Sequence, residues 1–223
     1  MSKSTVSKRV KAQPRRTVEV ARLFPSQGEW TETDYLALPE TNSIVELSDG
    51  KLIMPPPPSV DHQDISAQLF SALRSFVRER DLGTVLYAPT GVRLWPGKIR
   101  EPDVLFVAHE HADRIKQDMI YGPPDLVVEI LSPGTEETDR WGKCKEYEQA
   151  GVSEYWIVDP ETSTVTVYAL TEGAYKLQSV FSSREVVRSA LLEGFEIAVD
   201  EIFKTEWRSH ETRMDRPGRL GGA

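Results

Sequence analysis

The sequence predicts a single α/β domain built on a mixed β-sheet with helices on its faces. Short apolar runs of strand length alternate with longer segments whose apolar residues recur at helical spacing. Turn-forming residues separate most of these segments. The chain has 223 residues, of which 39% are hydrophobic, and this is enough for one well-buried core.

The first part of the chain is expected to form a short helix, a hairpin and a long helix. Thr31 or Thr33 is a suitable cap for the short helix. Within residues 44–54, apolar runs flank Asp49-Gly50, and an Asp-Gly pair in that setting is a strong hairpin signal. The long helix is predicted over residues 61–81, because its apolar residues recur at helical spacing.

The rest of the chain is expected to supply most of the sheet and a second long helix. Short apolar runs between turn signals predict strands over residues 85–87, 92–95, 103–107, 125–131, 154–158, 165–169 and 175–180. The last two runs suggest a closing antiparallel pair. A short helix is expected over 111–116, and a longer one over 136–150, which Gly151 ends.

Several classes of protein do not fit this sequence. No apolar run approaches the ~20 residues of a membrane span, and the N-terminus has no signal-peptide core. The only cysteine is Cys144, which excludes an internal disulfide and a cysteine-based zinc site. We therefore expect a cytoplasmic protein with no membrane partner.

Charge is unevenly distributed along the chain. The net charge of −8 argues against a protein that coats nucleic acid. Residues 1–16 nevertheless hold six basic residues and no acid. We interpret this stretch as a disordered tail rather than an arm that binds phosphate. The expected organisation is a flexible basic tail over 1–25, one domain over 26–207, and a flexible tail over 208–223.

Two carboxylates stand in strands where burial should exclude a charge. Asp103 begins one apolar run and Glu129 interrupts another. A buried charge is costly unless it is paired or binds a metal. Asp125 shares a face with Glu129 but lies ~13 Å from it along the strand, so Asp103 is the natural partner. The alternatives are a turn or cap role for Asp103, and for Glu129 an ion pair with Arg93 or Arg100.

The predicted helix 136–150 carries two lysines, and the helical period distinguishes them. Residues at 100° steps place Trp141, Cys144 and Tyr147 on its less polar side. Lys143 falls within that arc, whereas Lys145 points roughly 140° from its centre. Lys143 is therefore expected to face the sheet, and Cys144 to be a packing residue rather than a nucleophile.

Several segments of the chain together resemble a known protein family. The segments that carry it are Val45-Glu46-Leu47, Asp49-Gly50, Met54-Pro55-Pro56, His62-Gln63, Pro102-Asp103, Val128-Glu129-Ile130-Leu131-Ser132-Pro133, Asp139-Arg140-Trp141-Gly142-Lys143, Tyr147, Gly151-Val152 and Glu154-Tyr155-Trp156-Ile157-Val158-Asp159-Pro160. Over about residues 30–205 the chain resembles the Uma-two (Uma2) family of putative restriction endonucleases, part of the PD-(D/E)xK nuclease superfamily. The resemblance implies a restriction-endonuclease-like mixed β-sheet core flanked by helices.

The resemblance also implies a site. The position two after Glu129 is Leu131 rather than the lysine of the superfamily motif, and the family pattern places that lysine at Lys143. It further suggests Glu46 as a peripheral metal ligand, with a half-exposed strand residue as the alternative. His62 is either a phosphate contact or a capping or surface group.

These expectations combine into a Mg²⁺-dependent (or Mn²⁺-dependent) endonuclease that hydrolyses phosphodiester bonds in nucleic acid, DNA in particular. Asp103, Glu129 and the Ile130 carbonyl would hold the ion, and Lys143 would stabilise developing charge. The main alternative is a non-catalytic nuclease-fold module that binds nucleic acid or a protein. A glycosidase ranks lower, because its carboxylate pair needs no lysine. A homodimer would allow both strands to be cut.

Overall fold

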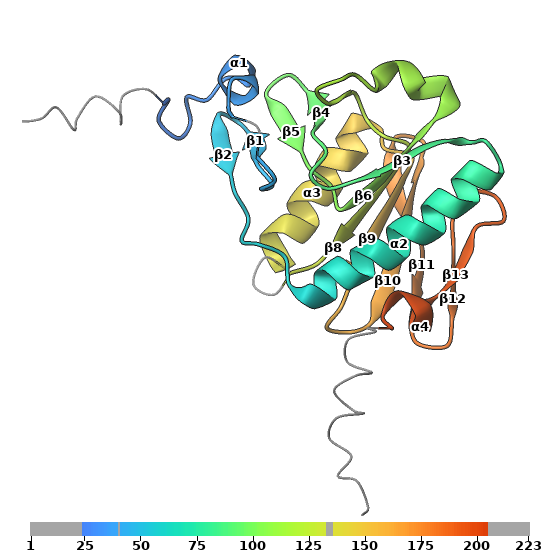
Figure 1. Ribbon diagram of the computed structural model, residues 1–223. Helices are drawn as coiled ribbons and strands as arrows, with labels where there is room; N and C mark the ends of the chain where they lie inside the picture. Colours follow the sequence, from blue (N-terminus) through green and yellow to red (C-terminus); the bar gives the residue numbers. More distant parts are fainter. Residues whose placement is uncertain (1–23, 40, 133–135, 205–223) are drawn as a thin grey trace, which may run out of the picture.

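The centre of the molecule is a six-stranded mixed sheet (Figure 1). The computed structural model describes residues 24–39, 41–132 and 136–204. In spatial order the strands are β11 (Ala174–Phe181), β10 (Thr164–Thr171), β9 (Glu154–Asp159), β8 (Leu126–Ile130), β6 (Val104–Ala108) and β3 (Gly83–Tyr87). The β8–β9 pair is parallel and the other neighbours are antiparallel. The predicted mixed sheet is therefore confirmed.

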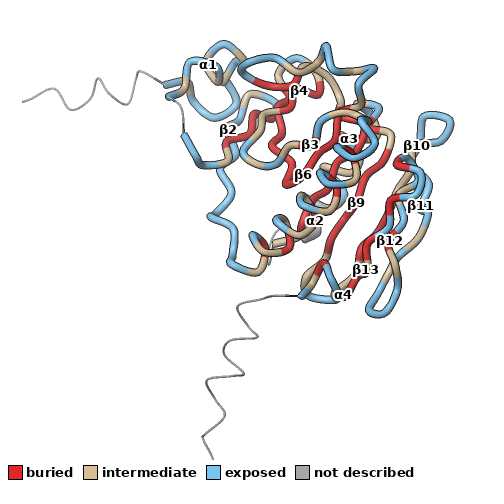
Figure 2. The backbone as a smooth tube through the Cα atoms, turned by 45° about the vertical axis from the view of Figure 1, so that its right-hand side comes forward, coloured by how far each residue is buried: buried red, intermediate tan, exposed pale blue. Residues whose placement is uncertain are grey.

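Helices cover both faces of this sheet, as the sequence predicts (Figures 1 and 2). On one face lies α2 (Val60–Glu79), whose Leu69 and Leu73 pack against Val104 and Val128. The same core includes residues of the hairpin β12–β13 (Val186–Arg188 and Glu196–Ala198) and of α4 (Val199–Ile202). Burial of these apolar faces against one another is the main force holding the layers together.

The opposite face of the sheet carries α3 (Glu136–Ala150). Side chains alternate along a strand, so Leu105 and Val127 point away from α2. They form a second core with Tyr147 of α3. Asp103 and Glu129 have the same parity as Leu105 and Val127, so both carboxylates belong to the α3 side of the sheet.

A smaller five-stranded sheet lies beside α3. In spatial order its strands are β2 (Lys51–Ile53), β1 (Glu46–Ser48), β5 (Lys98–Arg100), β4 (Val92–Trp95) and β7 (Ile120–Tyr121). It has a small core of its own, formed by Leu47, Ile99 and Met119, against which Tyr35 of α1 (Glu32–Leu36) packs. The 3₁₀ helix η2 (His109–Arg114) follows β6.

Most predicted elements are present with shifts of one or two residues at their ends. Thr31, not Thr33, caps α1, through a hydrogen bond from the Asp34 amide. Asp49 and Gly50 both have positive φ in the turn between β1 and β2, as a two-residue hairpin turn requires. Cys144 packs against the core on the α3 side, as expected.

Four short strands and one helix are not predicted from the sequence, namely β5, β7, β12, β13 and α4. None exceeds four residues, so no periodicity can develop within them. The proposed tails fall outside the described residues, apart from Phe24 and Pro25; the Phe24 ring stacks on Trp30. Within the part of the chain that is described, no helix is long and apolar enough to span a membrane.

Candidate active site

The two strand carboxylates lie opposite each other. Val104 of β6 pairs with Val128 of β8 in antiparallel register, which places residues 103 and 129 as the next facing pair. The Asp103 carboxylate accepts a hydrogen bond from the Ile130 amide, with Oδ2 2.7 Å from the nitrogen. This bond ties the start of β6 to the end of β8, where the sheet opens onto a cavity.

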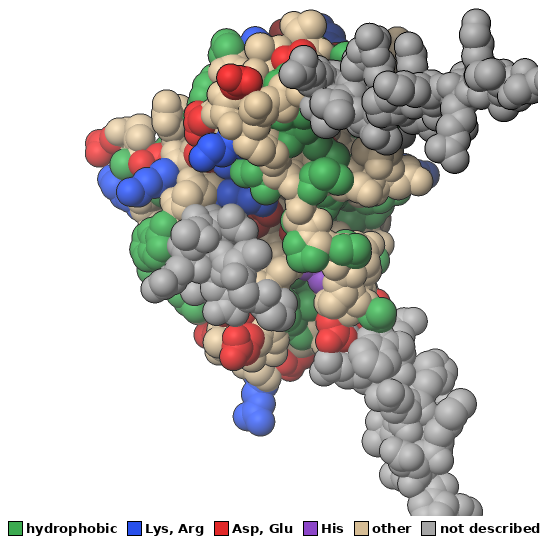
Figure 3. Space-filling model, turned by 90° about the vertical axis from the view of Figure 1, so that its left-hand side faces the viewer, with side chains coloured by type: hydrophobic (Ala, Val, Ile, Leu, Met, Phe, Trp, Pro, Cys, Tyr) green, Lys and Arg blue, Asp and Glu red, His purple; other side chains and the backbone are tan. Residues whose placement is uncertain are grey.

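The cavity has a volume of about 110 Å³ and receives both carboxylates. Glu46, His62, Glu101 and Lys143 also line it. Its remaining wall is largely apolar and includes Ile44, Ile53, Pro55, Pro56, Pro58 and Leu131. Figure 3 shows this side of the molecule, with a histidine visible between hydrophobic side chains.

Glu129 is held by two donors from α3. Its Oε2 lies 3.0 Å from Lys143 Nζ, and its Oε1 accepts a 2.6 Å hydrogen bond from the Tyr147 hydroxyl. Lys143 and Tyr147 are four residues apart and therefore lie on one side of the helix. The orientation predicted for Lys143 is confirmed, and Lys145 is exposed.

The alternative partners proposed for Glu129 are both engaged elsewhere. Arg93 pairs with Glu32 at 2.6 Å. Arg100 contacts Glu46 and Glu146, each at 2.7 Å. The suggestion that Glu129 forms an ion pair with either arginine is therefore wrong, because those arginines have carboxylates of their own.

Burial and neighbouring charges alter the ionisation of this pair. Burial raises the pKa of Glu129, the Lys143 ammonium opposes that rise, and the charges of Asp103 and Glu46 add to it. Burial alone would lower the pKa of Lys143, but the charges of Glu129 and Glu46 outweigh it, so that pKa is raised. Lys143 therefore remains a cation at neutral pH, inside a group of carboxylates.

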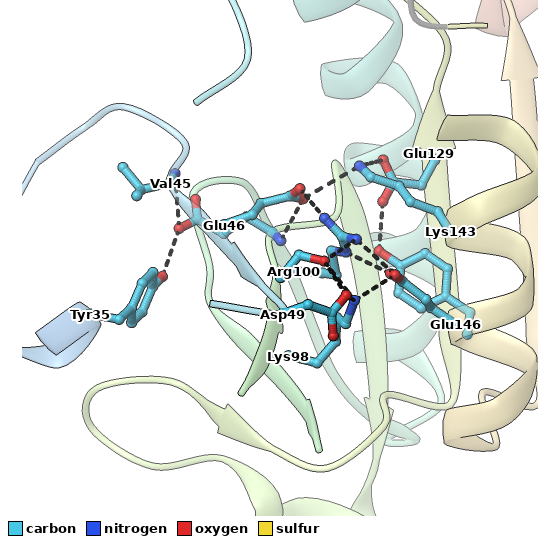
Figure 4. Close-up of polar contacts among 12 residues, drawn as sticks. Tyr35, Val45, Glu46, Asp49, Lys98, Arg100, Glu129, Lys143 and Glu146 are labelled. Carbon is cyan, nitrogen blue, oxygen red and sulfur yellow. Dashed lines mark hydrogen bonds and ion pairs between the residues drawn. The ribbon is translucent and has the colours of Figure 1, made fainter. Parts of the chain in front are cut away.

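Glu46 belongs to a network of ion pairs between the small sheet and α3 (Figure 4). Its Oε2 accepts a 2.7 Å hydrogen bond from Arg100, and its Oε1 lies 3.4 Å from Lys143 Nζ. Arg100 and Lys98 both reach Glu146 of α3. Glu46 is only 4% exposed, so the half-exposed alternative is wrong.

His62 reaches the site from the first turn of α2. Ser59 caps that helix, and His62 Nε2 lies 3.3 Å from Asp103 Oδ1. Burial lowers the pKa of His62, but the hydrogen bond and charge of Asp103, with the charge of Glu129, outweigh it and raise that pKa. Since the side chain is 9% exposed, the surface alternative is wrong. Its Nδ1 has no hydrogen-bond partner among the described residues.

Glu101 is a further carboxylate that the sequence analysis did not select. Its Oε1 accepts hydrogen bonds from the Val45 amide at 3.4 Å and the Tyr35 hydroxyl at 3.2 Å. Burial, reinforced by the charge of Glu46 and opposed by these two bonds, raises the pKa of Glu101 to about 7. The acid is therefore close to half-protonated at neutral pH.

The donor groups suit a hard divalent cation. Asp103, Glu129 and Ile130 line one cavity, and magnesium prefers oxygen ligands and keeps several of its waters. Burial, and after it the charges of Asp103 and Glu46, raise the pKa of Glu129, and a bound cation would oppose both effects. Among the described residues no group of three or more His, Cys, Asp or Glu side chains is arranged to hold a metal alone. Any site here therefore needs the backbone carbonyl and water as additional ligands.

The residues that hold Glu129 and Glu46 in place are harder to predict from the sequence. Tyr147 follows Lys143 by one helical turn, and this spacing is a readable signal. Lys98, Arg100 and Glu146 become a group only when the small sheet contacts α3. No spacing along the chain identifies such a contact.

Comparisons with known proteins identify the family and the fold of this chain. A family model described as "Uma2: Putative restriction endonuclease" matches residues 32–200. The chain belongs to this family. A search of curated proteins finds no match.

A solved structure of related fold is the "putative nuclease belonging to DUF820 from Anabaena variabilis ATCC 29413". The match has a TM-score of 0.66 and 23% sequence identity, and it covers 78% of this chain and 97% of the other. At this identity the likeness establishes the fold. This Uma2 protein therefore has the restriction-endonuclease-like fold that its sequence predicts.

Proposed function

We propose that this Uma2 protein is a metal-dependent endonuclease that hydrolyses phosphodiester bonds in DNA. The observation that carries the proposal is the convergence of Asp103, Glu129 and Lys143 on one cavity. Two carboxylates and an ammonium group are the parts that metal-assisted hydrolysis of a phosphodiester needs. Membership of a family of restriction-endonuclease-like proteins supports the same chemistry.

The proposed ligands of the ion are Asp103, Glu129 and the Ile130 carbonyl, with Glu46 at the periphery. A bound Mg²⁺ or Mn²⁺ would polarise the phosphodiester and lower the pKa of a water molecule. Burial would raise the pKa of Glu146, but hydrogen bonds and charges of Arg100 and Lys98 outweigh it and lower that pKa. Arg100 also pairs with Glu46.

The chain's own groups position the reacting atoms. The Lys143 side chain is half-buried and its ammonium is fixed by Glu129, so it is already oriented to stabilise charge that develops on the phosphate. His62 lines the cavity and is held through Nε2 near Asp103, which suits contact with a phosphate bound there. The Tyr147 hydroxyl fixes the Glu129 carboxylate from the opposite side.

One observation favours the second candidate, a non-catalytic module with a nuclease fold. Both oxygens of Glu129 already accept hydrogen bonds from α3, as if the carboxylate served only to join sheet and helix. In that case Glu129 would be needed for stability and not for cleavage. Metal-dependent activity separates the two candidates.

The test is incubation of the purified protein with supercoiled plasmid and with single-stranded DNA, in Mg²⁺, Mn²⁺ or EDTA. We expect nicking with either cation, none with EDTA, and products with 5′-phosphate and 3′-hydroxyl ends. Glu129→Ala should fold and lose cleavage. Cleavage that persists in EDTA or in Glu129→Ala would overturn the proposal.

The proposal includes a cytoplasmic protein, and a homodimer where both DNA strands are cut, since one site cuts one strand at a time. Sedimentation with and without duplex DNA measures the oligomeric state. A monomer that linearises plasmid in one binding event would contradict the dimer.

A further inference from the structure

A second surface of this protein leads directly away from the candidate site along α2. The helix starts beside the cavity, where His62 contacts Asp103, and it crosses the face of the central sheet (Figure 1). At ~1.5 Å per residue, Phe70 lies ~12 Å and Arg78 ~24 Å along the helix from His62. This distance suits a short segment of an extended polymer that leaves the cavity.

An aromatic pair occupies the near end of this surface. The rings of Phe70 and Tyr87 are 4.5 Å apart at an angle of 58°, and Tyr87 is 53% exposed. Tyr87 is the last residue of β3 and pairs with Val104, and the next amide, of Ala88, donates to the Asp103 carbonyl at 3.1 Å. The exposed ring therefore lies next to the strand that supplies a proposed metal ligand.

Two arginines continue the line beyond the aromatic pair. Phe70, Arg74 and Arg78 are spaced four residues apart, so they follow one stripe along the helix. Arg74 and Arg78 are exposed, and the Arg74 guanidinium lies 5.4 Å from the centre of the Phe70 ring. Ser71, Ser75 and Glu79 complete a shallow hollow with these three residues.

Arg74 and Arg78 differ in their ion pairing from the basic side chains near the cavity. Within the described part of the chain, neither Arg74 nor Arg78 has a carboxylate within ion-pair distance. Lys98, Arg100 and Lys143 are all paired with carboxylates. The carboxylate that lines the hollow, Glu79, accepts from Ser75 and lies 3.8 Å from Arg80. The protein has a net charge of −8, and here guanidinium groups without a carboxylate partner among the described residues lie near a half-buried Phe70 and an exposed Tyr87. This combination is the feature that suggests a ligand.

We propose that Phe70, Tyr87, Arg74 and Arg78 form a track for single-stranded DNA that leads into the candidate active site. Aromatic rings beside guanidinium groups bind unpaired bases and phosphates. Duplex DNA fits less well, because its base faces are stacked and cannot reach the Tyr87 ring. The inference rests on the proposed nuclease function and specifies its preferred substrate as an unpaired strand, either free or as a single-stranded stretch within a duplex.

Binding without cleavage tests the track. A fluorescein-labelled oligothymidine of about 15 nucleotides is titrated with the full chain in EDTA, and anisotropy gives the Kd. Arg74→Gln/Arg78→Gln should raise the Kd at ~50 mM salt about tenfold or more, and should reduce the slope of log K against log salt by about 1.4. Arg74→Lys/Arg78→Lys should keep most of that slope. Tyr87→Leu, which retains an apolar contact with Phe70, should raise the Kd about fivefold.

The matched control is Lys145→Gln/Lys176→Gln, which removes the same charge from α3 and from β11 at the opposite edge of the sheet. It should bind as the wild type does. The track would be contradicted by an equal increase in Kd in the control and track variants. It would also be contradicted if the wild type did not bind, or if it bound a duplex of the same length with a lower Kd. Tighter binding of an oligouridine RNA than of oligothymidine would contradict the proposal that the bound strand is DNA.

Failure of this inference and failure of the proposed function give different results. Wild-type cleavage with unchanged Kd values in the track variants contradicts the track alone. Loss of binding in those variants, with no cleavage in any metal, supports the track and contradicts the nuclease.

Discussion

Lys143 Nζ lies 3.0 Å from Glu129 Oε2, although the two residues are 14 positions apart and belong to different elements. The same ammonium lies 3.4 Å from Glu46 Oε1. The Lys143 ammonium therefore contacts a carboxylate of each sheet and connects both sheets to α3.

Replacement of Lys143 should separate metal binding from catalysis. We predict that Lys143→Gln cuts DNA about 10²–10³-fold more slowly, because a preorganised charge near the phosphate is lost. The same change removes a positive charge that repels a divalent cation, so Mn²⁺ should bind more tightly. Single-turnover cleavage and calorimetric titration measure the two effects. Lys145→Gln is the control, and equal activity in the two variants would contradict the role of Lys143.

The Tyr147 hydroxyl should contribute to stability through Glu129. Tyr147→Phe leaves the buried Glu129 Oε1 without its 2.6 Å donor, at a cost of about 1–3 kcal/mol. Tyr121→Phe removes a similar hydroxyl–carboxylate bond at an exposed site, Asp118, and should cost less than about 0.5 kcal/mol. Urea unfolding of both variants gives the comparison. A Tyr147→Phe protein as stable as the wild type would show that this bond contributes nothing.

The Arg100 ion pairs should be essential to the contact between the small sheet and α3. Arg100→Met leaves Glu46 and Glu146 with fewer partners in a buried setting, and we expect a loss of about 3–5 kcal/mol. Arg188→Met breaks an exposed pair with Glu196 and should cost at most about 1 kcal/mol. Chemical denaturation measures both. Similar losses for the two variants would mean that the Arg100 network is not structural.

The local pattern of the sequence predicted the central residues but not their surroundings. The period and rise of a strand excluded Asp125 and selected Asp103 as the partner of Glu129, and the helical period selected Lys143 over Lys145, since these values are fixed by backbone geometry. The strand Lys98–Arg100 was missed because it is short and carries a charge at each end. Those charges can be buried because Glu146 of α3 meets both of them and Glu46 meets Arg100, and these contacts exist only in the tertiary structure.

Glu101 should make stability depend on pH. Its pKa is raised to about 7 in the folded state, so the folded protein binds the Glu101 proton more tightly than the unfolded chain does. The resulting destabilisation is absent below pH ~4.5, grows as the pH rises, and is complete above about 7. Glu101→Gln should therefore be about 1–2 kcal/mol more stable than the wild type at pH 8 and no more stable at pH 4.5. Unfolding in EDTA at both values measures the difference, and a gain that is the same at both would contradict this ionisation.

The most direct test of the account is a calorimetric titration of Mn²⁺ into the wild type, Asp103→Asn and Glu129→Gln, together with plasmid cleavage by the same samples. We predict that the wild type binds the ion and nicks DNA, and that each variant folds but loses both properties. Mn²⁺ binding and cleavage that survive in both variants would contradict the assignment of Asp103 and Glu129 as the metal site of a nuclease.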